Sequence, residues 1–315
     1  MKRQLVIGAS GQLGIELIIG LQDRYGVDAV VATDIRQGND EQANRSEFML
    51  LDATNEAAVR QVISEGSFET VYHLVAMLSA KGENDPLAAW DLNMKSLLNI
   101  LECAREGMVD KVFWPSSIAV FGPDAKKDGT PQDTFCDPTT IYGVSKVSGE
   151  LWANYYNKKY GVDIRSIRYP GLIGHRSMPG GGTTDYAVDA FYKAIDGVEF
   201  ECYLEEGEVL PMMHMDDAVR ATLDLMEAPS ENISVRTAYN LSGCSFSPSE
   251  LNDAIAEIKP GFKTVYNPDA RQNIAASWPN SIDDSRARVD WGWEPKYDTK
   301  GLVSAMLEAL SCTAH

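Results

Sequence analysis

The sequence predicts an α/β fold, in which a doubly wound parallel sheet is followed by a smaller, mixed α/β region. Short apolar runs alternate with helical patterns through the first 170 residues, as in strands joined by crossover helices. A glycine-rich turn joins the first apolar run to the first helical pattern, which is typical of sheets that bind a dinucleotide. After residue 170 this regular alternation is lost.

The apolar runs give the expected elements of the first part in order. We expect strands at 4–7, 28–33, 48–51, 70–75, 111–114 and 162–168. Helices are expected after Gly14, from Pro86 with Asp85 as its N-cap, and over 142–160 with Gly161 ending it. Residues 123–140 are rich in Pro, Asp, Lys and Thr and are predicted to be a loop.

The second part is expected to consist of helices and short strands. Helical patterns cover 185–195, 215–228, the stretch after a capping box at 247–250, the stretch after Asp283, and the end of the chain from about residue 300. Strands are expected at 237–241 and 263–266. We expect residues 1–170 to form a nucleotide-binding domain and 171–315 a substrate-binding lid, with 215–241 returning to the large sheet.

The glycine-rich turn has the pattern G-x-x-G-x-x-G at Gly8, Gly11 and Gly14, between a strand and a helix. Gly8 permits a tight turn, Gly11 lets the backbone approach a pyrophosphate, and Gly14 lets the helix pack on the strand. The amides at the start of the helix then bind the phosphates. This context predicts a dinucleotide cofactor.

Acidic residues after the next two strands indicate which dinucleotide is bound. Asp34 lies 20 residues after Gly14, where a carboxylate binds the adenosine ribose hydroxyls of NAD and repels the 2′-phosphate of NADP. Arg36 leaves NADP open as an alternative, because a nearby arginine can accept that phosphate. Asp52 and Ala53, at the tip of the third strand, are expected near the adenine.

The candidate chemistry centres on Tyr142 and Lys146, which share one face of a helix about one turn apart. An ammonium beside a phenol favours the phenolate, so the tyrosine becomes a proton acceptor near neutral pH. Ser116 and Ser117 lie at the carboxyl end of an upstream strand, where ligands bind in open α/β sheets. Either hydroxyl is a candidate to hold the substrate oxygen.

The composition excludes several other classes of protein. A net charge of −18 argues against nucleic acid or anionic membrane as a partner, and the chain has no apolar run long enough to span a bilayer. Five scattered cysteines and four histidines form no disulfide pattern and no metal-ligand spacing. The first strand begins almost at residue 1, so we expect a cytoplasmic protein without a targeting segment.

These motifs together resemble the extended branch of the short-chain dehydrogenase/reductase superfamily, with its Rossmann sheet. The glycine turn, Asp34, the Ser-Ser-Ile-Ala-Val-Phe-Gly stretch at 116–122, Tyr142 with Lys146, and Arg-Tyr-Pro-Gly at 168–171 follow the order of that family. Within the branch, Gly-Gly-Gly-Thr-Thr at 180–184, Leu-Pro-Met-Met at 210–213 and Ser-Trp-Pro-Asn-Ser at 277–281 are similar to the L-threonine 3-dehydrogenases of the short-chain type.

The resemblance implies NAD-dependent oxidation of the L-threonine 3-hydroxyl to 2-amino-3-oxobutanoate, without a metal. It implies Tyr142, Lys146, Ser117 and Ser116 as catalytic residues, and Ser79, Ser116, Tyr142, Thr183, Thr184 and Trp278 as substrate-binding residues. The implied cofactor-binding residues are Gly8, Ser10, Gly11, Gln12, Leu13, Gly14, Asp34, Arg36, Asp52, Ala53, Leu74, Ala76, Asn93, Tyr142, Lys146, Tyr169 and Leu172. It also implies a homodimer that pairs through the helices at 87–106 and 142–160.

Two alternatives differ from this in class. A nucleotide-sugar epimerase or dehydratase needs basic and aromatic groups in the second half of the chain, but 171–220 contain only Arg176, Lys193 and Arg220. Dehydratases also place Asp and Glu where this chain has Ile118 and Ala119. A catalytically silent NAD sensor is the second alternative, and the intact Ser-Tyr-Lys set argues against it.

The loop at 180–184 is expected to close over the substrate. A site for a small zwitterion has to desolvate a carboxylate and an ammonium, and the lid contains little basic charge. We therefore expect Thr183, Thr184 and the glycine amides to hold the carboxylate, with Trp278 excluding water. Glycines in this loop would let it move when empty.

Overall fold

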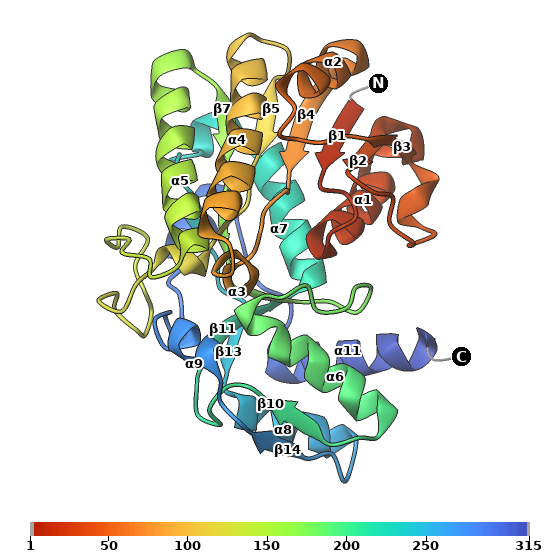
Figure 1. The fold of residues 1–315 in the computed structure, drawn as a ribbon, viewed down its shortest axis with the longest axis vertical. Helices are drawn as coiled ribbons and strands as arrows, with labels where there is room; N and C mark the ends of the chain where they lie inside the picture. The colour runs from red at the N-terminus through yellow and green to blue at the C-terminus, as the bar shows by residue number, and fades with distance from the viewer. Residues whose placement is uncertain (1–2, 314–315) are drawn as a thin grey trace.

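The computed structural model describes residues 3–313 and has the expected α/β architecture (Figure 1). Its central sheet has six parallel strands in the order β3-β2-β1-β4-β5-β7. These strands are β1 (Arg3–Ile7), β2 (Val30–Asp34), β3 (Glu47–Leu50), β4 (Phe68–His73), β5 (Lys111–Phe113) and β7 (Asp163–Arg165). Because the order reverses between β1 and β4, the carboxyl ends of these two strands form the crevice where such sheets bind ligands.

Helices cover both faces of this sheet, and the alternation of β1 side chains sets which face each helix packs on. Val6 points to the face covered by α1 (Gln12–Tyr25) and α7 (Met215–Glu227), whose apolar side chains form one core cluster with it. Leu5 and Ile7 point to the opposite cluster, to which α2 (Glu56–Gly66), α4 (Pro86–Arg105) and α5 (Ile141–Tyr160) contribute. The sheet is therefore doubly wound, as predicted.

The expected strand at 162–168 is wrong in one respect, because the chain changes sheets within it. Arg165 ends β7 in the central sheet, whereas β8 (Ile167–Tyr169) pairs with β6 (Ser116–Ser117) and β12 (Tyr239–Asn240). On the two sides of this break, Arg165 and Arg168 are both buried and have different partners, the first at α7 and the second at Glu150.

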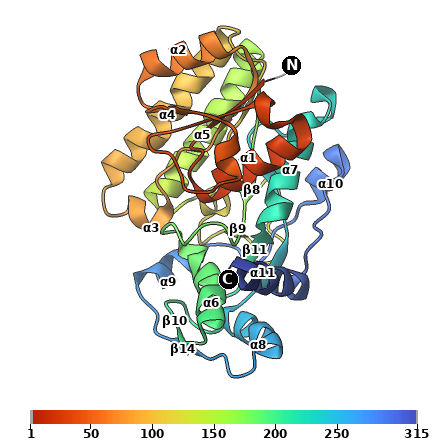
Figure 2. The ribbon, with the colours of Figure 1, turned by 90° about the vertical axis from the view of Figure 1, so that its right-hand side faces the viewer.

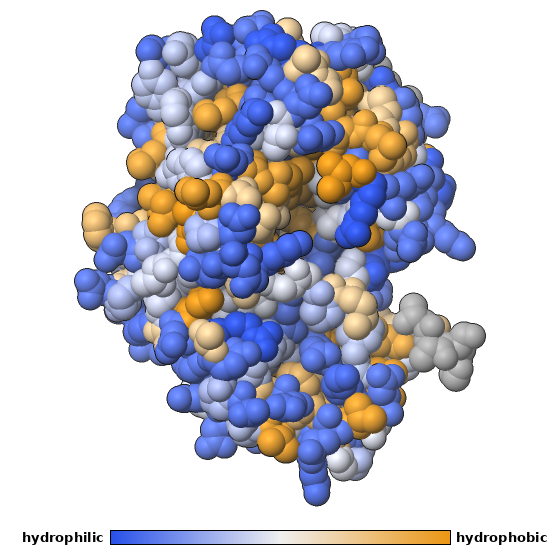
Figure 3. Space-filling view, viewed as in Figure 1, coloured by the Kyte–Doolittle hydropathy of each residue, from blue (hydrophilic) through white to orange (hydrophobic). Residues whose placement is uncertain are grey.

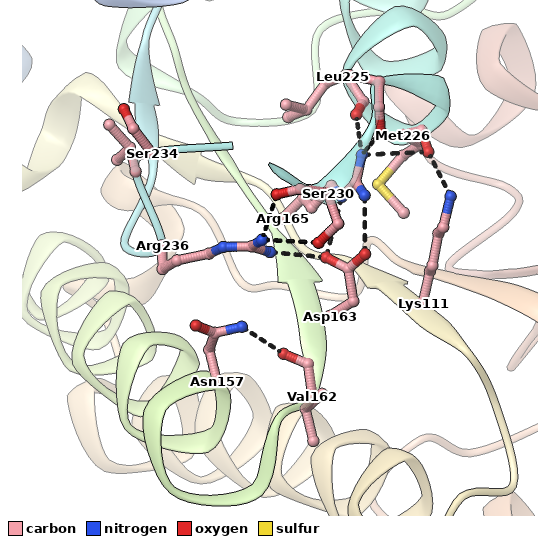
Figure 4. Close-up of polar contacts among 12 residues, drawn as sticks. Lys111, Asn157, Val162, Asp163, Arg165, Leu225, Met226, Ser230, Ser234 and Arg236 are labelled. Carbon is pink, nitrogen blue, oxygen red and sulfur yellow. Dashed lines mark hydrogen bonds and ion pairs between the residues drawn. The ribbon is translucent and has the colours of Figure 1, made fainter. Parts of the chain in front are cut away.

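A polar cluster connects the carboxyl end of α7 to strands β5 and β7 of the central sheet (Figure 4). The buried guanidinium of Arg165 donates to the carbonyl oxygens of Leu225 and Ala228 at 2.6 and 2.7 Å, and it pairs with Asp163 at 2.7 Å. Lys111 donates to the carbonyl oxygen of Met226 at 3.0 Å. These cations satisfy helix-end carbonyls that have no intrahelical partner.

The lower lobe in Figures 1 and 2 is built from small sheets and helices around a third core cluster. One sheet joins β9 (Gly171–Ile173), β11 (Leu210–His214) and β13 (Cys244–Phe246), and a second joins β10 (Phe200–Cys202) to β14 (Thr264–Tyr266). The helices around this cluster are α6 (Tyr186–Asp196), α8 (Pro248–Ile258), α9 (Ala270–Ala275) and α11 (Thr299–Thr313). Helix α10 (Ser285–Trp291) instead packs in the upper lobe, beside α7 (Figure 2). Short helix α3 (Ser79–Gly82) lies between the two lobes.

Helix α7 packs on α1 against the large sheet, while β12 (Tyr239–Asn240) pairs in the small sheet with β8, and the expected return of residues 215–241 to the large sheet stays a prediction. The division at residue 170 itself stays a prediction, and residues 1–2 and 314–315 of its two ranges lie outside the described residues. Within residues 3–313, every helix is too short or too polar to cross a membrane.

Candidate active site

A cleft of about 240 Å³ lies at the carboxyl ends of the central strands, between the two lobes. Apolar residues gather across the middle of the face shown in Figure 3, at the level of these strand ends. The cleft brings together most of the residues that the sequence singled out. Those that line it are Gly8, Gly11, Gln12, Leu13, Gly14, Leu74, Ala76, Ser79, Ser116, Ser117, Tyr142, Lys146, Tyr169, Leu172, Thr183, Thr184 and Trp278.

The glycine turn after β1 has the geometry that a dinucleotide cradle requires. Gly8 has a φ of +92°, and a Cβ at Gly14 would lie 2.3 Å from the Gly8 carbonyl oxygen, so the turn can close only on glycine. A Cβ at Gly11 would have no neighbour closer than 3.5 Å. Gly11 has no side chain to cap α1, so the first amides of this helix remain available to an anion.

Asp34 lies beside this cradle at the end of β2, where the sequence predicts the adenosine ribose. One carboxylate oxygen accepts a hydrogen bond from the Ser10 amide at 3.0 Å, and the other accepts from the Arg36 amide at 3.4 Å. The Ser10 hydroxyl donates to the Arg36 carbonyl oxygen at 2.8 Å. The Arg36 side chain is exposed. These contacts fix the carboxylate at the edge of the cradle, which favours NAD over NADP.

The adenine is expected near Asp52 and Ala53, which follow β3. Asp52 accepts hydrogen bonds from the amide and hydroxyl of Thr54, which lower its pKa. The Ala53 carbonyl oxygen accepts from Asn99 at 2.9 Å. Ile35 and Leu50 are exposed at the ends of β2 and β3.

Asn93, whose binding of the cofactor stays a prediction, bonds in this structure to Met77 and Ser145. Its amide oxygen accepts from the Met77 amide at 2.7 Å, and its nitrogen donates to the Met77 carbonyl at 3.2 Å and to Ser145 at 3.1 Å. Asn93 therefore braces the segment after β4 against α5, and it does not line the cleft.

Tyr142 and Lys146 lie in the first turns of α5, whose N-cap is Thr140. The Tyr142 phenol is hydrogen-bonded to Ser117, and the Lys146 ammonium lies 5.4 Å from the centre of the Tyr142 ring. Lys146 donates to the Pro115 carbonyl oxygen at 2.6 Å and lies 4.4 Å from the centre of the Trp114 ring. The phenol, the Ser117 hydroxyl and the ammonium thus meet at one wall of the cleft.

Burial shifts the pKa values of both groups. Burial raises the pKa of Tyr142 to about 12, although the hydrogen bond to Ser117 opposes this. Burial also lowers the pKa of Lys146 to about 7, against the attraction of Glu150. In the free protein, burial determines the direction of the Tyr142 pKa, and the expected stabilisation of the phenolate by Lys146 stays a prediction.

The two candidate serines have different hydrogen-bond partners in the structure. The Ser116 hydroxyl donates to Glu150 at 2.6 Å, and Glu150 forms a buried ion pair with Arg168 at 2.7 Å. Ser117 instead bonds to Tyr142 and accepts from the Ala119 amide at 3.2 Å. Both serines line the cleft, but the Ser116 hydroxyl is already bonded to the buried Glu150–Arg168 pair, whereas Ser117 interacts with Tyr142.

The opposite wall comes from the lower lobe and α3. The hydroxyls of Ser79 and Thr183 are 3.1 Å apart, although their residues are 104 positions apart in the chain. Thr184 packs on Gly171, where a Cβ would lie 2.8 Å from the Thr184 Cβ. Trp278 is buried and lines the same space.

The glycine amides at 180–182 are not free to hold a substrate carboxylate, so this expectation was wrong. All three amides donate to a single carboxylate oxygen of Asp185, at distances of 2.8, 2.9 and 2.8 Å. Burial raises the pKa of Asp185, and these three bonds oppose that effect. Sequence reasoning missed Asp185 and Glu150, since neither belongs to a motif that distinguishes a ligand-binding acid from a surface acid.

The chain matches the model of the NAD dependent epimerase/dehydratase family over residues 4–242, and it belongs to that family. A curated relative, an uncharacterized epimerase/dehydratase from Staphylococcus saprophyticus, is 46% identical over 98% of this chain and 97% of its own length. NAD, predicted as the cofactor, is confirmed by this membership and by the structures described next.

Solved structures place the chain more narrowly within the family. It is similar to the holo form of a GalE-like L-threonine dehydrogenase from Cupriavidus necator, at 49% identity and a TM-score of 0.95, over 98% of this chain and 99% of that one. It is also similar to the apo form of a monomeric L-threonine 3-dehydrogenase from a metagenome, at 44% identity and a TM-score of 0.95, over 99% and 100% of the two chains. The predicted resemblance, fold and oxidoreductase class are thereby confirmed.

Proposed function

We propose that this protein oxidises the 3-hydroxyl of L-threonine to 2-amino-3-oxobutanoate with NAD and without a metal. The observation that carries the proposal is the meeting of Ser117, Tyr142 and Lys146 with a hydroxyl-lined wall, beside the glycine cradle. The L-threonine dehydrogenases to which the chain is similar support the choice of substrate.

Tyr142 is the proposed proton acceptor. Its phenolate would take the proton from the substrate hydroxyl and become the neutral phenol as the hydride leaves the same carbon, and Ser117 would donate a hydrogen bond to the substrate oxygen. When bound, NAD supplies the hydride acceptor and the positive charge of its nicotinamide ring. The Lys146 ammonium lies beside the Tyr142 ring and, when protonated, stabilises the phenolate.

The residues of the opposite wall would hold the amino acid. Ser79, Thr183 and Thr184 offer hydroxyl donors for the carboxylate, and Trp278 excludes water. Lys146 is the only Lys or Arg among the residues that line the cleft in the described part of the chain. The described lining residues therefore include no arginine to pair with the phosphates of a nucleoside-diphosphate sugar, which fits a small zwitterion better.

The direct test mixes the protein and NAD with a panel of 3-hydroxy amino acids and nucleoside-diphosphate sugars, and follows NADH absorbance. We expect NADH to form with L-threonine. Conversion of a nucleotide sugar without threonine oxidation would establish the epimerase or dehydratase alternative. Tight NAD binding without turnover of any compound would establish the sensor alternative.

We also propose a cytoplasmic homodimer that pairs through α4 and α5. Support comes from apolar side chains exposed on these helices, among them Leu87 on α4 and Leu151, Trp152 and Tyr155 on α5. One similar enzyme is described as monomeric, so family membership alone does not decide the assembly. Sedimentation of the protein with and without Leu151→Glu tests the pairing: a wild-type monomer contradicts it.

A further inference from the structure

The loop between Ser117 and Tyr142 is joined to the segment that carries Trp278, although about 150 residues separate them in the chain. In Figure 1 this loop (yellow) lies beside α9, which leads directly into the Trp278 segment. The Lys127 ammonium donates to the carbonyl oxygens of Ala276 and Trp278, at 2.6 and 2.7 Å. It therefore binds the backbone on both sides of Ser277 and reaches Trp278 itself.

Backbone contacts continue this connection on the other side of Trp278. The Lys127 carbonyl oxygen accepts from the amides of Asn280 and Ser281, at 2.8 and 3.1 Å, and Thr130 forms a bridge with Ile282. Lys127 thus bonds to the chain on both sides of Pro279. Its side chain binds the residues before this proline, and its carbonyl oxygen binds those after it.

Trp278 is where these contacts meet the cleft. Its side chain is 4% exposed, packs in the core cluster of the lower lobe, and lines the space beside Tyr142. The loop that holds its backbone connects the strand of Ser117 to the helix of Tyr142. Moving the Lys127 contacts would therefore shift the substrate wall relative to the reacting groups and leave the cradle at Gly8–Gly14 unchanged.

We propose that Lys127 is a positioning residue for the substrate, which acts by fixing Trp278 against the segment that carries Ser117 and Tyr142. The expected change in KM rests on the proposed function, because it assumes that Trp278 lines the substrate site. An ammonium suits this role because it can donate to two carbonyl oxygens at once, whereas a backbone amide donates one hydrogen.

The experiment compares Lys127→Met with Lys127→Arg and with Lys126→Met. Lys126 is the matched control, since it is the adjacent lysine and its side chain is exposed. We expect Lys127→Met to raise KM for threonine roughly five- to tenfold, as for the loss of hydrogen bonds from a charged donor. The kcat and the Kd of NAD should change less than about twofold, Lys127→Arg should restore most of the KM, and Lys126→Met should have no effect.

Hydrogen exchange of peptides covering 274–283 provides a measurement that does not depend on the substrate. Lys127→Met should speed exchange there relative to the wild type, and Lys126→Met should not. If Lys127→Met does not fold, Lys127→Gln, whose side chain is uncharged and shorter than that of lysine, takes its place in both measurements. Unchanged exchange at 274–283 would overturn the inference, as would an unchanged KM or an equal loss of NAD affinity. A wild type inactive on threonine would instead overturn the proposed function, and the exchange result would still decide whether Lys127 fixes this segment.

Discussion

The protein contains two glycine-rich loops at the same cleft, and they use their backbone amides in opposite ways. In the loop after β1, Gly11 offers no cap and the first amides of α1 remain available to a phosphate. In the loop at 180–182, three consecutive amides already bind the carboxylate of Asp185. The first loop is preformed for an external anion, whereas the second holds an anion of its own chain.

This difference shows that glycine content alone does not identify an anion site. The first loop stands between a buried strand and a helix, and both flanking elements can be predicted from the sequence. The second loop is flanked by a short strand and a 3-10 turn, and its occupant, Asp185, lies three residues after the last glycine. The two loops should therefore respond differently to mutation.

The largest expected effect is at the wall next to the first loop. Tyr142→Phe removes the proposed proton acceptor, so kcat should fall by about 100- to 10,000-fold. NAD binding should remain nearly intact, because the cradle at Gly8–Gly14 does not depend on the phenol. Steady-state rates and a titration with NAD measure both quantities, and a mutant within threefold of the wild-type rate would refute the assignment.

The adjacent serines provide a matched pair for this prediction. Ser117→Ala removes a donor from the reacting oxygen and should lower kcat on the order of 100-fold. Ser116→Ala removes a partner of the buried Glu150 and should lower thermal stability with kcat nearly unchanged. The reverse result would show that Ser116 is the catalytic hydroxyl.

At the second loop, Thr184→Ala should weaken the use of threonine without weakening the binding of NAD. The loss of one buried donor corresponds to about 1–3 kcal/mol in kcat/KM. Thr184 lies across the cleft from the cradle, so the Kd of NAD should hardly change. Equal losses in NAD binding and in threonine use would show that the second loop belongs to the cofactor site.

The first loop should also determine the choice of cofactor. Asp34, held by the amides of Ser10 and Arg36, should make kcat/KM for NAD at least about tenfold higher than for NADP, through repulsion of the 2′-phosphate. Rates measured with both cofactors at one threonine concentration test this. Comparable values would mean that the exposed Arg36 dominates the pocket.

A separate effect, on stability and not on activity, concerns the ion pair between α1 and the segment before the second loop. Glu16 in α1 pairs at 3.3 Å with Arg176, which precedes the second loop, and Arg176 also contacts Asp40 at 3.3 Å. Burial raises the pKa of Glu16 from 4.5 to about 7, helped by the charges of Asp216 and Asp40 and opposed by Arg176. Ionising Glu16 therefore costs the folded protein up to about 3 kcal/mol as the pH rises from 4.5 to 7.

Glu16→Gln removes this ionisation and tests whether it stabilises or destabilises the folded protein. The variant should match the wild-type melting temperature near pH 5 and exceed it near pH 8, because the raised pKa destabilises only the ionised form. Melting curves across this range, with NAD affinity as a control for the cradle, provide the measurement. A variant that is less stable at pH 8 than at pH 5, relative to wild type, would show that the ion pair is net stabilising.

Much of the fold could be predicted because it rests on local patterns. The apolar strands at 4–7 and 111–114, the Asp85 cap with Pro86, and the capping box at 247–250 all form as expected. The break between β7 and β8 could not be predicted from local patterns, because Arg165 and Arg168 on its two sides bond to partners distant in the chain. The helix α2 was missed because its apolar positions are few: only Val59 and Ile63 are buried.

For the candidate site, the sequence could predict the residues of motifs but not their polar partners. The glycines, Ser117, Tyr142, Lys146 and Trp278 all line the cleft, as expected. Asn93, predicted to bind the cofactor, bonds in this structure to the Met77 backbone. The partners of Ser116 and of the glycines at 180–182 come from residues whose position is set only by packing, so sequence spacing could not reveal them.

Hydrogen exchange at the two glycine loops tests the central claim, that the first binds the cofactor and the second belongs to the substrate site. Peptides covering 8–15 and 180–186 are compared in the free protein, with NAD, and with NAD plus 2-aminobutyrate, which lacks the reacting hydroxyl. The account predicts that NAD alone slows exchange at 8–15, and that 180–186 gain protection only when the amino acid is added. Protection of 180–186 by NAD alone, or no response to NAD at 8–15, would contradict it.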